Sequence, residues 1–244
     1  MSHQERAMPC PARGGVLGII GGMGPAATAD FLVKLTQLTP AGFDQDHIAS
    51  VTCCLPSIPD RSEAILANGL SPLPAMLRSL RMLERCDVSC VVMPCNTAHY
   101  WFDYIQRATT LPMIHIVDSV RHALLARDAA HDPVGLLATT ATICTGIYAN
   151  RLAPHGIDCL IPTDDEQKHI MDAIRRIKAG ADDEHCTASI RAVAASLRRR
   201  GARSIILGCT ELSLVLPSDE SEFLDSTAAL ARACVLRFST VYRA

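Results

Sequence analysis

Two cysteines follow apolar runs and precede polar residues in the same manner. Cys95 lies in VVMPCNTAHY at residues 91–100, and Cys209 lies in SIILGCTEL at residues 204–212. Each apolar run predicts a buried parallel strand, and the residues after each cysteine predict the start of a helix. Ligands bind beyond the carboxyl ends of parallel strands, so both thiols are predicted to lie where chemistry takes place.

The first strand of each half strengthens this match. LGIIGG at 17–22 resembles VGLLAT at 134–139, and the distance from Gly18 to Cys95 is 77 positions against 74 from Gly135 to Cys209. A thiol that only fills a core has no reason to recur at the same point of both halves. We therefore predict that Cys95 and Cys209 are functional and that most of the other nine cysteines are small buried hydrophobes.

Two opposed thiols suit inversion at a carbon atom. A helix N-terminus favours a thiolate, so one sulfur removes a proton from one face while the other delivers a proton to the opposite face. Such an acid–base pair needs no metal. The carbanion formed from an amino acid needs preorganised donors, for which Asn96, Thr97 and Thr210 are candidates together with backbone N–H groups.

Two other function classes remain open at this point. A cysteine-dependent hydrolase or isomerase would pair one thiol with a histidine base and form a covalent intermediate, and the paired thiols argue against it. A non-catalytic ligand-binding module would tolerate the loss of either thiol.

Strands must alternate with helices to place these turns. Strands are expected at residues 16–22, 48–55, 88–93, 113–117, 133–138, 157–161 and 203–208, and helices at 26–39, 72–86, 97–108, 119–127, 143–153, 165–179, 185–200 and 226–238. This order predicts an α/β protein with a parallel sheet in each half. We expect two similar domains, 15–117 and 118–225, related by pseudo-twofold symmetry, with the active site in the cleft between them.

Composition excludes several partners and sites. The formal net charge is −2, so we expect no nucleic-acid partner, and no apolar stretch is long enough to span a membrane. The polar residues 1–14 do not resemble a signal peptide, which favours a cytoplasmic protein. The eleven cysteines include no C-x-x-C pair and indicate neither zinc nor a disulfide scaffold. GIIGGMGP lacks the dinucleotide pattern, and His99 is expected to orient its surroundings locally.

The motifs together resemble one family. GIIGGMGPAAT, DQDHI, IPDR, PCNTAHY, GLLAT, IKAG and LGCTEL occur in this order, and the chain after about residue 15 is similar to the aspartate/glutamate racemase family, in particular its aspartate racemase branch. The resemblance implies cofactor-independent racemisation of an acidic amino acid, with aspartate favoured. It also implies a homodimer, and a C-terminal helix at 226–240 that returns to the first domain.

The resemblance also implies roles for single residues. Cys95 and Cys209 carry over as the acid–base pair, and Arg61 and Lys178 as the holders of the substrate's side-chain carboxylate. From the sequence alone, without the resemblance, Lys178 is best interpreted as a solvated residue at a helix end. Glu211 either receives the substrate ammonium or favours a helix start, and the sequence favours neither. The predicted substrate contacts are Met23, Arg61, Asn96, Thr97, Thr142, Lys178, Thr210 and Glu211.

Three positions distinguish the branches. Glutamate racemases have a histidine where this chain has Glu211, and an Asp-Ser-Gly turn where this chain has Gly-Met-Gly at 22–24. Both differences favour the aspartate branch. Many aspartate racemases have asparagine at the position of Leu55, so this residue is expected to relax the preference for aspartate.

Overall fold

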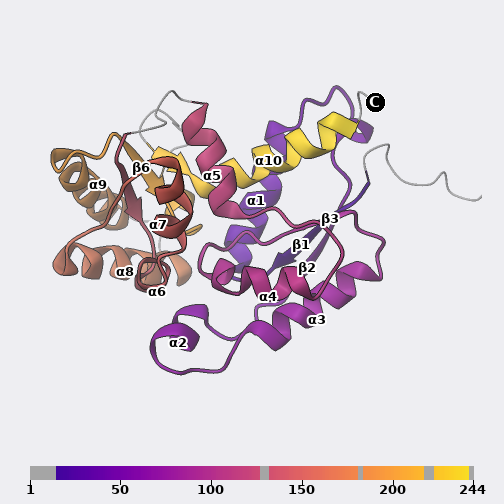
Figure 1. Ribbon diagram of the computed structural model, residues 1–244, viewed down its shortest axis with the longest axis horizontal. Coiled ribbons are helices and arrows are strands. Elements are labelled where there is room, and N and C mark those ends of the chain that lie inside the picture. Colours follow the sequence, from indigo (N-terminus) through magenta and orange to yellow (C-terminus); the bar gives the residue numbers. More distant parts are fainter. Residues whose placement is uncertain (1–14, 127–131, 181–183, 217–222, 242–244) are drawn as a thin grey trace, which may run out of the picture.

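The protein contains two parallel sheets, each covered by helices (Figure 1). The computed structural model describes residues 15–126, 132–180, 184–216 and 223–241. The strand order is β2-β1-β3 in the first sheet and β5-β4-β6-β7 in the second, and every pairing is parallel. The predicted α/β class with one sheet in each half is confirmed.

The first sheet is built around β1 (Leu17–Gly21), which lies between β2 (Ser50–Cys54) and β3 (Cys90–Val92). All of β1 is buried, as expected for an apolar strand covered on both faces. The helices that follow these strands in the first half are α1 (Pro25–Leu38), α2 (Arg61–Leu66), α3 (Leu73–Glu84) and α4 (Phe102–Arg107).

The second sheet is built around β4 (Val134–Leu137), which lies between β5 (Cys159–Leu160) and β6 (Ser204–Leu207), with β7 (Phe223–Asp225) beside β6. Its helices are α6 (Thr140–Cys144), α7 (Ile147–Leu152), α8 (Asp164–Lys178) and α9 (Glu184–Arg199). A capping box starts α8: Thr163 Oγ1 accepts from the Glu166 N–H, and Glu166 Oε2 accepts from the Thr163 N–H.

The last helices of the two halves are α5 (Ile116–Leu125) and α10 (Ser226–Val241). They begin in the same way. His115 Nδ1 accepts from the Val117 N–H at 3.1 Å, and Asp225 Oδ1 accepts from the Thr227 N–H at 2.8 Å. Each cap satisfies an N–H group that the first turn of a helix leaves unpaired. The two helices are therefore counterparts in the repeated architecture.

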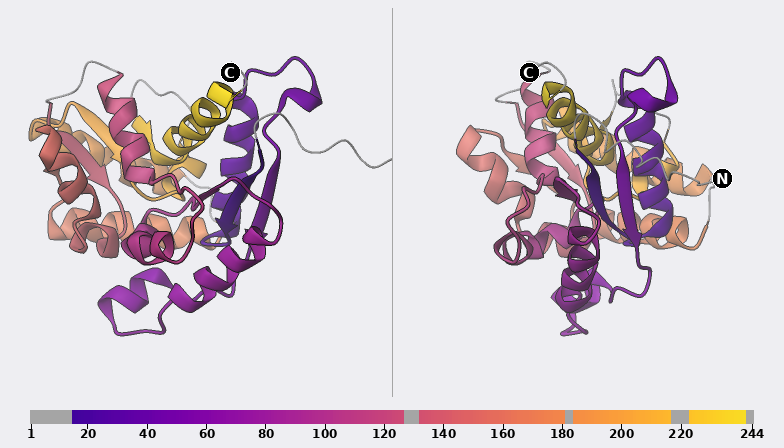
Figure 2. Two further views of the ribbon diagram at one scale, coloured as in Figure 1. Left: turned by 45° about the vertical axis from the view of Figure 1, so that its right-hand side comes forward. Right: turned by 90° about the vertical axis from the view of Figure 1, so that its right-hand side faces the viewer.

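These two helices also join the halves. α10 packs against both α5 and α1, and Figure 2 shows it between them. One continuous apolar cluster includes Leu17 and Phe31 from the first half and Leu136 and Leu230 from the second. The interface also carries charge, since Lys34 of α1 forms an ion pair with Asp225 at 2.7 Å.

Two expectations about single elements were wrong. Residues 113–117 do not form a strand: Met113 makes an isolated bridge to Val91, and α5 begins at Ile116, because the His115 side chain caps a helix there. The predicted helix at 143–153 is divided into α6 and α7, because Gly146 has a left-handed φ of 66°. The strand β7 and the helix α2 were not predicted.

The turn after β1 requires glycine. Gly22 has a φ of +89°, and a Cβ added there would lie 2.4 Å from the backbone of Leu55. A larger residue would push β2 away from β1 at the edge of the active site. None of the described helices is long and apolar enough to cross a membrane.

Candidate active site

Cys95 and Cys209 occupy equivalent positions in the two sheets. Val91 of β3 pairs with Gly18, and Ile205 of β6 pairs with Gly135. Each cysteine follows its strand residue by four positions and so lies just beyond the carboxyl end of the strand next to the central one. Both are nearly buried, with 6% and 5% of their surface exposed.

A cavity lies between the halves at this level. Its inner part is lined from both halves by Asp60, Arg61, Ser62, Asn96, Thr97, Thr139, Lys178, Cys209, Thr210 and Glu211. Its outer part is open to solvent beside the start of α1, where Gly24, Pro25, Ile58 and Leu214 contribute to the wall. Four charged residues line both parts: Asp60, Arg61, Lys178 and Glu211. They form a charged neck between solvent and the thiols.

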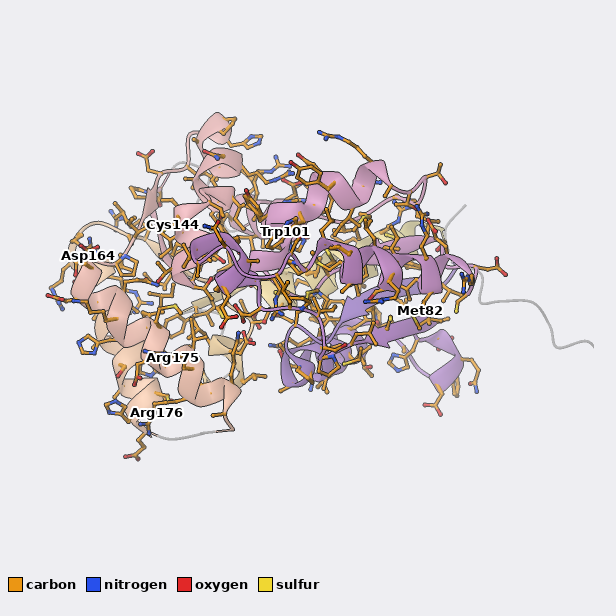
Figure 3. All side chains as sticks on the ribbon, turned by 90° about the horizontal axis from the view of Figure 1, so that it is seen from below. Met82, Trp101, Cys144, Asp164, Arg175 and Arg176 are labelled. Atoms are coloured by element: carbon orange, nitrogen blue, oxygen red, sulfur yellow. The ribbon has the colours of Figure 1, made fainter. Side chains whose placement is uncertain are left out.

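The helices around this cavity come from both halves. α2, in the first half, packs against α6 in the second. Figure 3 views the molecule from below, with α8, marked by Asp164 and Arg175, on one side and α3, marked by Met82, on the other. Lys178 is the last residue of α8, so the end of this helix supplies a cation to the cavity.

Hydrogen bonds to the backbone hold the guanidinium group of Arg61 in place. Nη1 donates to the carbonyl oxygens of Ile58 and Pro59 at 3.1 and 3.0 Å, while the buried Nε has no partner among the described residues. The preceding Asp60 caps α2 by accepting from the N–H groups of Ser62 and Glu63. Burial opposes the charge on Asp60, but these N–H groups, Lys178 and Arg61 together lower the pKa of its carboxyl. Arg61 lines the cavity and keeps Nε as a donor that no described residue uses.

Lys178 lies among acidic groups. Its Nζ is 4.0 Å from Glu211 Oε1. Burial works against its charge, but the negative charge of Glu211 and the nearby thiols Cys209 and Cys95 raise its pKa. Lys178 therefore remains a cation within electrostatic reach of both thiols.

Cys209 and Glu211 form a hydrogen-bonded pair. Cys209 Sγ donates to Glu211 Oε2 at 3.0 Å, and Thr210 Oγ1 donates to the same oxygen at 3.2 Å. Burial and then the charge of Glu211 raise the pKa of the Cys209 thiol well above its usual value, while Lys178 lowers it. Glu211 Oε1 is buried and has no hydrogen-bond partner among the described residues.

Three threonine hydroxyls join the turns of the two halves. Thr97 Oγ1 lies 3.1 Å from Thr139 Oγ1 and 2.9 Å from Thr142 Oγ1, and the latter two are 2.9 Å apart. Thr97 and Thr139 line the cavity, whereas Thr142 lies behind them in the same network. This cluster fixes the turn after Cys95 against the second half.

Asn96 is held by the second half. Its Oδ1 accepts from Tyr148 OH at 2.7 Å, and its Nδ2 donates to Ser226 Oγ at 2.9 Å. Ser226 in turn donates to the carbonyl of Leu207 at 2.7 Å. Asn96 borders the cavity, but its side chain already serves the contact between the halves.

Met23 lies in the apolar core of the first half with 2% of its surface exposed, and it is not part of the cavity wall. Of the predicted site residues, those at the cavity are Arg61, Asn96, Thr97, Lys178, Cys209, Thr210 and Glu211. Cys95 precedes Asn96 and is buried, but it is not among the lining residues; its charge reaches the cavity through Lys178.

Some residues of the site were not predicted. Asp60 and Thr139 lie within the IPDR and GLLAT motifs but were not singled out, and Tyr148 and Ser226 lie in none of the motifs. The D-R-S-E order at 60–63 carries a helix-cap signal that could have found Asp60. Tyr148 and Ser226 act through contacts between distant parts of the chain, and these are visible only once the halves are assembled.

His99 ties the Cys95 turn to α5. Its Nε2 accepts from the Ile116 N–H at 3.1 Å, which leaves Nδ1–H to donate to the Cys95 carbonyl at 2.8 Å. Burial lowers the pKa of His99 to about 4. His99 is therefore a neutral link, as its position one turn after the thiol predicted. No cluster of three or more metal-ligating side chains occurs among the described residues.

Comparisons with known proteins identify a family. The Asp/Glu/hydantoin racemase model matches residues 20–234. The broad specificity amino-acid racemase RacX of Bacillus subtilis is 30% identical over 230 residues, which are 90% of this chain and 96% of RacX.

Solved structures agree. The aspartate racemase of Picrophilus torridus has a TM-score of 0.80 and 33% identity, covering 93% of this chain and 95% of that one. The glutamate racemase of Francisella tularensis, at 15% identity and a TM-score of 0.63 over 95% and 82% of the two chains, shares the fold. With paired thiol turns at one cavity and this fold, the chain belongs to the Asp/Glu/hydantoin racemase family and is an amino-acid racemase.

Proposed function

We propose that the protein racemises an acidic amino acid, with aspartate preferred, and that Cys95 and Cys209 act as its two acid–base groups. The observation that carries this proposal is the equivalence of the two cysteines: Cys95 follows Val91, which pairs with Gly18 of β1, by four residues, and Cys209 follows Ile205, which pairs with Gly135 of β4, by four residues. Cys209 and the two residues after Cys95 line one cavity. The likeness to the aspartate racemase of Picrophilus torridus supports aspartate as substrate.

The two thiols divide the reaction between the faces of the α-carbon. One sulfur, as thiolate, takes the α-proton and becomes a thiol, while the other thiol gives its proton to the opposite face and becomes a thiolate. The net charge of the pair is unchanged. Lys178, which lies near both sulfurs, and the donors around Thr97 and Thr210 stabilise the charge of the carbanion.

The charges of the cavity match a dicarboxylic amino acid. The free Nε edge of Arg61 receives one carboxylate, and Lys178 contributes the second cation. Glu211 Oε1, which lacks a hydrogen bond, is the acceptor available to the substrate ammonium. These roles account for the acidic substrate and for its orientation.

A broader amino-acid substrate range is the second candidate. RacX of Bacillus subtilis is named for broad specificity, and the apolar residue Leu55 lies with its backbone against the turn of Gly22. Aspartate and glutamate differ by one methylene, which typically changes discrimination by only about 1–3 kcal/mol. A panel of aspartate, glutamate, asparagine and alanine separates the two candidates. Faster turnover of alanine than of aspartate would overturn the acidic preference.

The reaction itself is tested in deuterated water. L-Aspartate should lose optical rotation and gain deuterium at the α-carbon with dialysed enzyme and with no added cofactor. Cys95→Ser and Cys209→Ser should each lower the racemisation rate by at least about 100-fold, because a hydroxyl is a much weaker base than a thiolate. The matched control is Cys144→Ser, since Cys144 is an exposed thiol. Full activity of Cys209→Ser would rule out the two-base scheme.

We also propose that the chain acts in the cytoplasm as a homodimer, on the basis of the family resemblance. Light scattering of the purified protein measures the oligomeric state directly, and a monomer at working concentration would refute the dimer.

A further inference from the structure

The two thiol turns differ in the second residue after the cysteine. The second residue after Cys95 is Thr97, and the second residue after Cys209 is Glu211. Thr97 turns its hydroxyl to Thr139 and Thr142, whereas Glu211 turns a carboxylate oxygen to the thiol itself. The repeated architecture thus gives one sulfur an uncharged neighbour and the other an anionic hydrogen-bond acceptor.

Glu211 contacts Cys209 through one carboxylate oxygen and lies near Lys178 through the other. Oε2 accepts from both Cys209 Sγ and Thr210 Oγ1, and Oε1 lies 4.0 Å from Lys178 Nζ. Only 5% of the residue is exposed, so its charge acts on the sulfur through little intervening solvent. A like charge at this distance disfavours the thiolate and favours the thiol.

We propose that Glu211 holds the proton on Cys209 in the free enzyme, so that Cys209 enters the reaction as the acid and Cys95 as the base. Glu211 is a positioning residue: it remains a carboxylate throughout and exchanges no proton. After one turnover, Cys95 carries the proton taken from the substrate and Cys209 is a thiolate. Transfer of one proton through solvent from Cys95 to Cys209 restores the starting arrangement.

Other charged and titratable groups also face the site and affect which of the two cysteines holds the proton. They are Lys178 from α8, Tyr148 from α7, and Asp60 and Arg61 at the start of α2. Lys178 stabilises the Cys209 thiolate and therefore opposes Glu211. Removing the charge of Glu211 should lower the pH at which Cys209 forms a thiolate. Removing the charge of Lys178 should raise that pH.

The inference rests on the proposed function, but its test does not need substrate. The equilibrium constant of racemisation is one, so the two directions keep equal kcat/KM and do not report the bias. Alkylation by iodoacetamide does report it, because only thiolates react rapidly. Peptide mass analysis after brief labelling at a series of pH values gives separate rates for Cys95 and Cys209.

In the parent protein near neutral pH, Cys95 should be labelled at least about tenfold faster than Cys209. Glu211→Gln keeps an acceptor for the thiol but removes the charge, and the midpoint of Cys209 labelling should fall by about one pH unit or more, which is about tenfold in rate near neutrality. Glu184→Gln removes an exposed carboxylate and should match the parent.

An unchanged labelling profile of Cys209 in Glu211→Gln, with the parent circular dichroism spectrum, would overturn the inference. If Glu211→Gln does not fold, Lys178→Met provides the second test and should slow Cys209 labelling; faster labelling would contradict the inference. A parent protein that shows the labelling bias but racemises no amino acid would refute the proposed function while leaving the electrostatic coupling in place.

Discussion

At the scale of single residues, Arg61 presents a defined edge to the cavity. Nη1 is occupied by two carbonyl oxygens, and the buried Nε has no partner among the described residues. In the proposed function this edge of the guanidinium group receives a substrate carboxylate. Lysine keeps the charge but lacks the fork that binds two oxygens. Arg61→Lys should therefore raise KM for aspartate by roughly 10- to 100-fold, the equivalent of about 1.5–3 kcal/mol for a charged hydrogen bond, and change kcat less. Steady-state kinetics with aspartate measure this.

Alanine provides the matched substrate, since it has no side-chain carboxylate. Its KM should change little in Arg61→Lys. Equal losses for aspartate and alanine would mean that Arg61 binds the α-carboxylate or maintains the fold of α2.

Much of the site could be predicted at this scale, because its chemistry is concentrated in short motifs. The cavity wall contains Arg61, Lys178, Thr210 and Glu211, all singled out from the sequence. Met23 lies in the core instead, since an apolar side chain in a turn next to a sheet packs inward where space allows. The hydrogen bond from Cys209 to Glu211 depends on the rotamers of a buried turn, and the sequence does not specify them.

At the scale of elements, His99 joins the turn of Cys95 to the start of α5. Replacement by leucine would leave the Ile116 N–H and the Cys95 carbonyl without this partner in a buried site. We expect His99→Leu to lower the free energy of unfolding by about 1–3 kcal/mol and to lower kcat, because the thiol turn loses its support. Urea denaturation and racemisation assays measure the two effects. Unchanged stability would show that water or another group replaces the link.

The same histidine makes stability depend on pH. Burial lowers the pKa of His99 to about 4, and burial and the neighbouring His99 lower that of His115. In the unfolded chain, histidine titrates near 6.5, so the unfolded state binds more protons between about pH 4 and 6.5. The free energy of unfolding should therefore fall as the pH drops through this range, by about 1.4 kcal/mol per pH unit from His99 alone.

Urea denaturation at a series of pH values in this range checks the slope. His99→Gln keeps a donor and an acceptor but does not titrate, and it should show a shallower pH dependence than the parent. Equal slopes would assign the pH dependence to other groups.

Helices and strands with a clear pattern of apolar residues were predicted well. Elements whose ends depend on a capping side chain were not. The apolar residues 113–117 suit a strand, yet the helix begins within them because His115 caps the Val117 N–H. A histidine at this position gives a weak capping signal in a sequence. Strand β7 has only three residues, too few to show alternation.

At the scale of the whole molecule, the halves are held together by a shared core and by charge. Lys34 of α1 forms an ion pair with Asp225, and its Nζ also donates to Ser213 Oγ at 3.2 Å. Asp225 in turn caps α10. Because the apolar cluster crosses from one half to the other, we expect a single cooperative unfolding transition. The only tryptophan, Trp101, belongs to the first half and reports on it by fluorescence, whereas far-ultraviolet circular dichroism reports on both halves.

The two signals should give the same urea midpoint and the same slope. A fluorescence transition that precedes or follows the circular dichroism transition would show that the halves unfold independently. The α/β class of this architecture was predictable from the order of its elements, but the contact between α5 and α10 was not, because nothing local in either helix specifies its partner.

The position of α10 has a consequence for biosynthesis. α1 is made early, but the helix that covers it is encoded after every other described element. While the ribosome translates the intervening residues, the apolar side chains of α1 that face α10 remain uncovered, and Phe31 and Leu35 are among the core residues concerned. A nascent chain of this kind depends on shielding by chaperones until residue 226 and those after it have left the exit tunnel. Circular permutation that moves α10 ahead of β1 would shorten that interval.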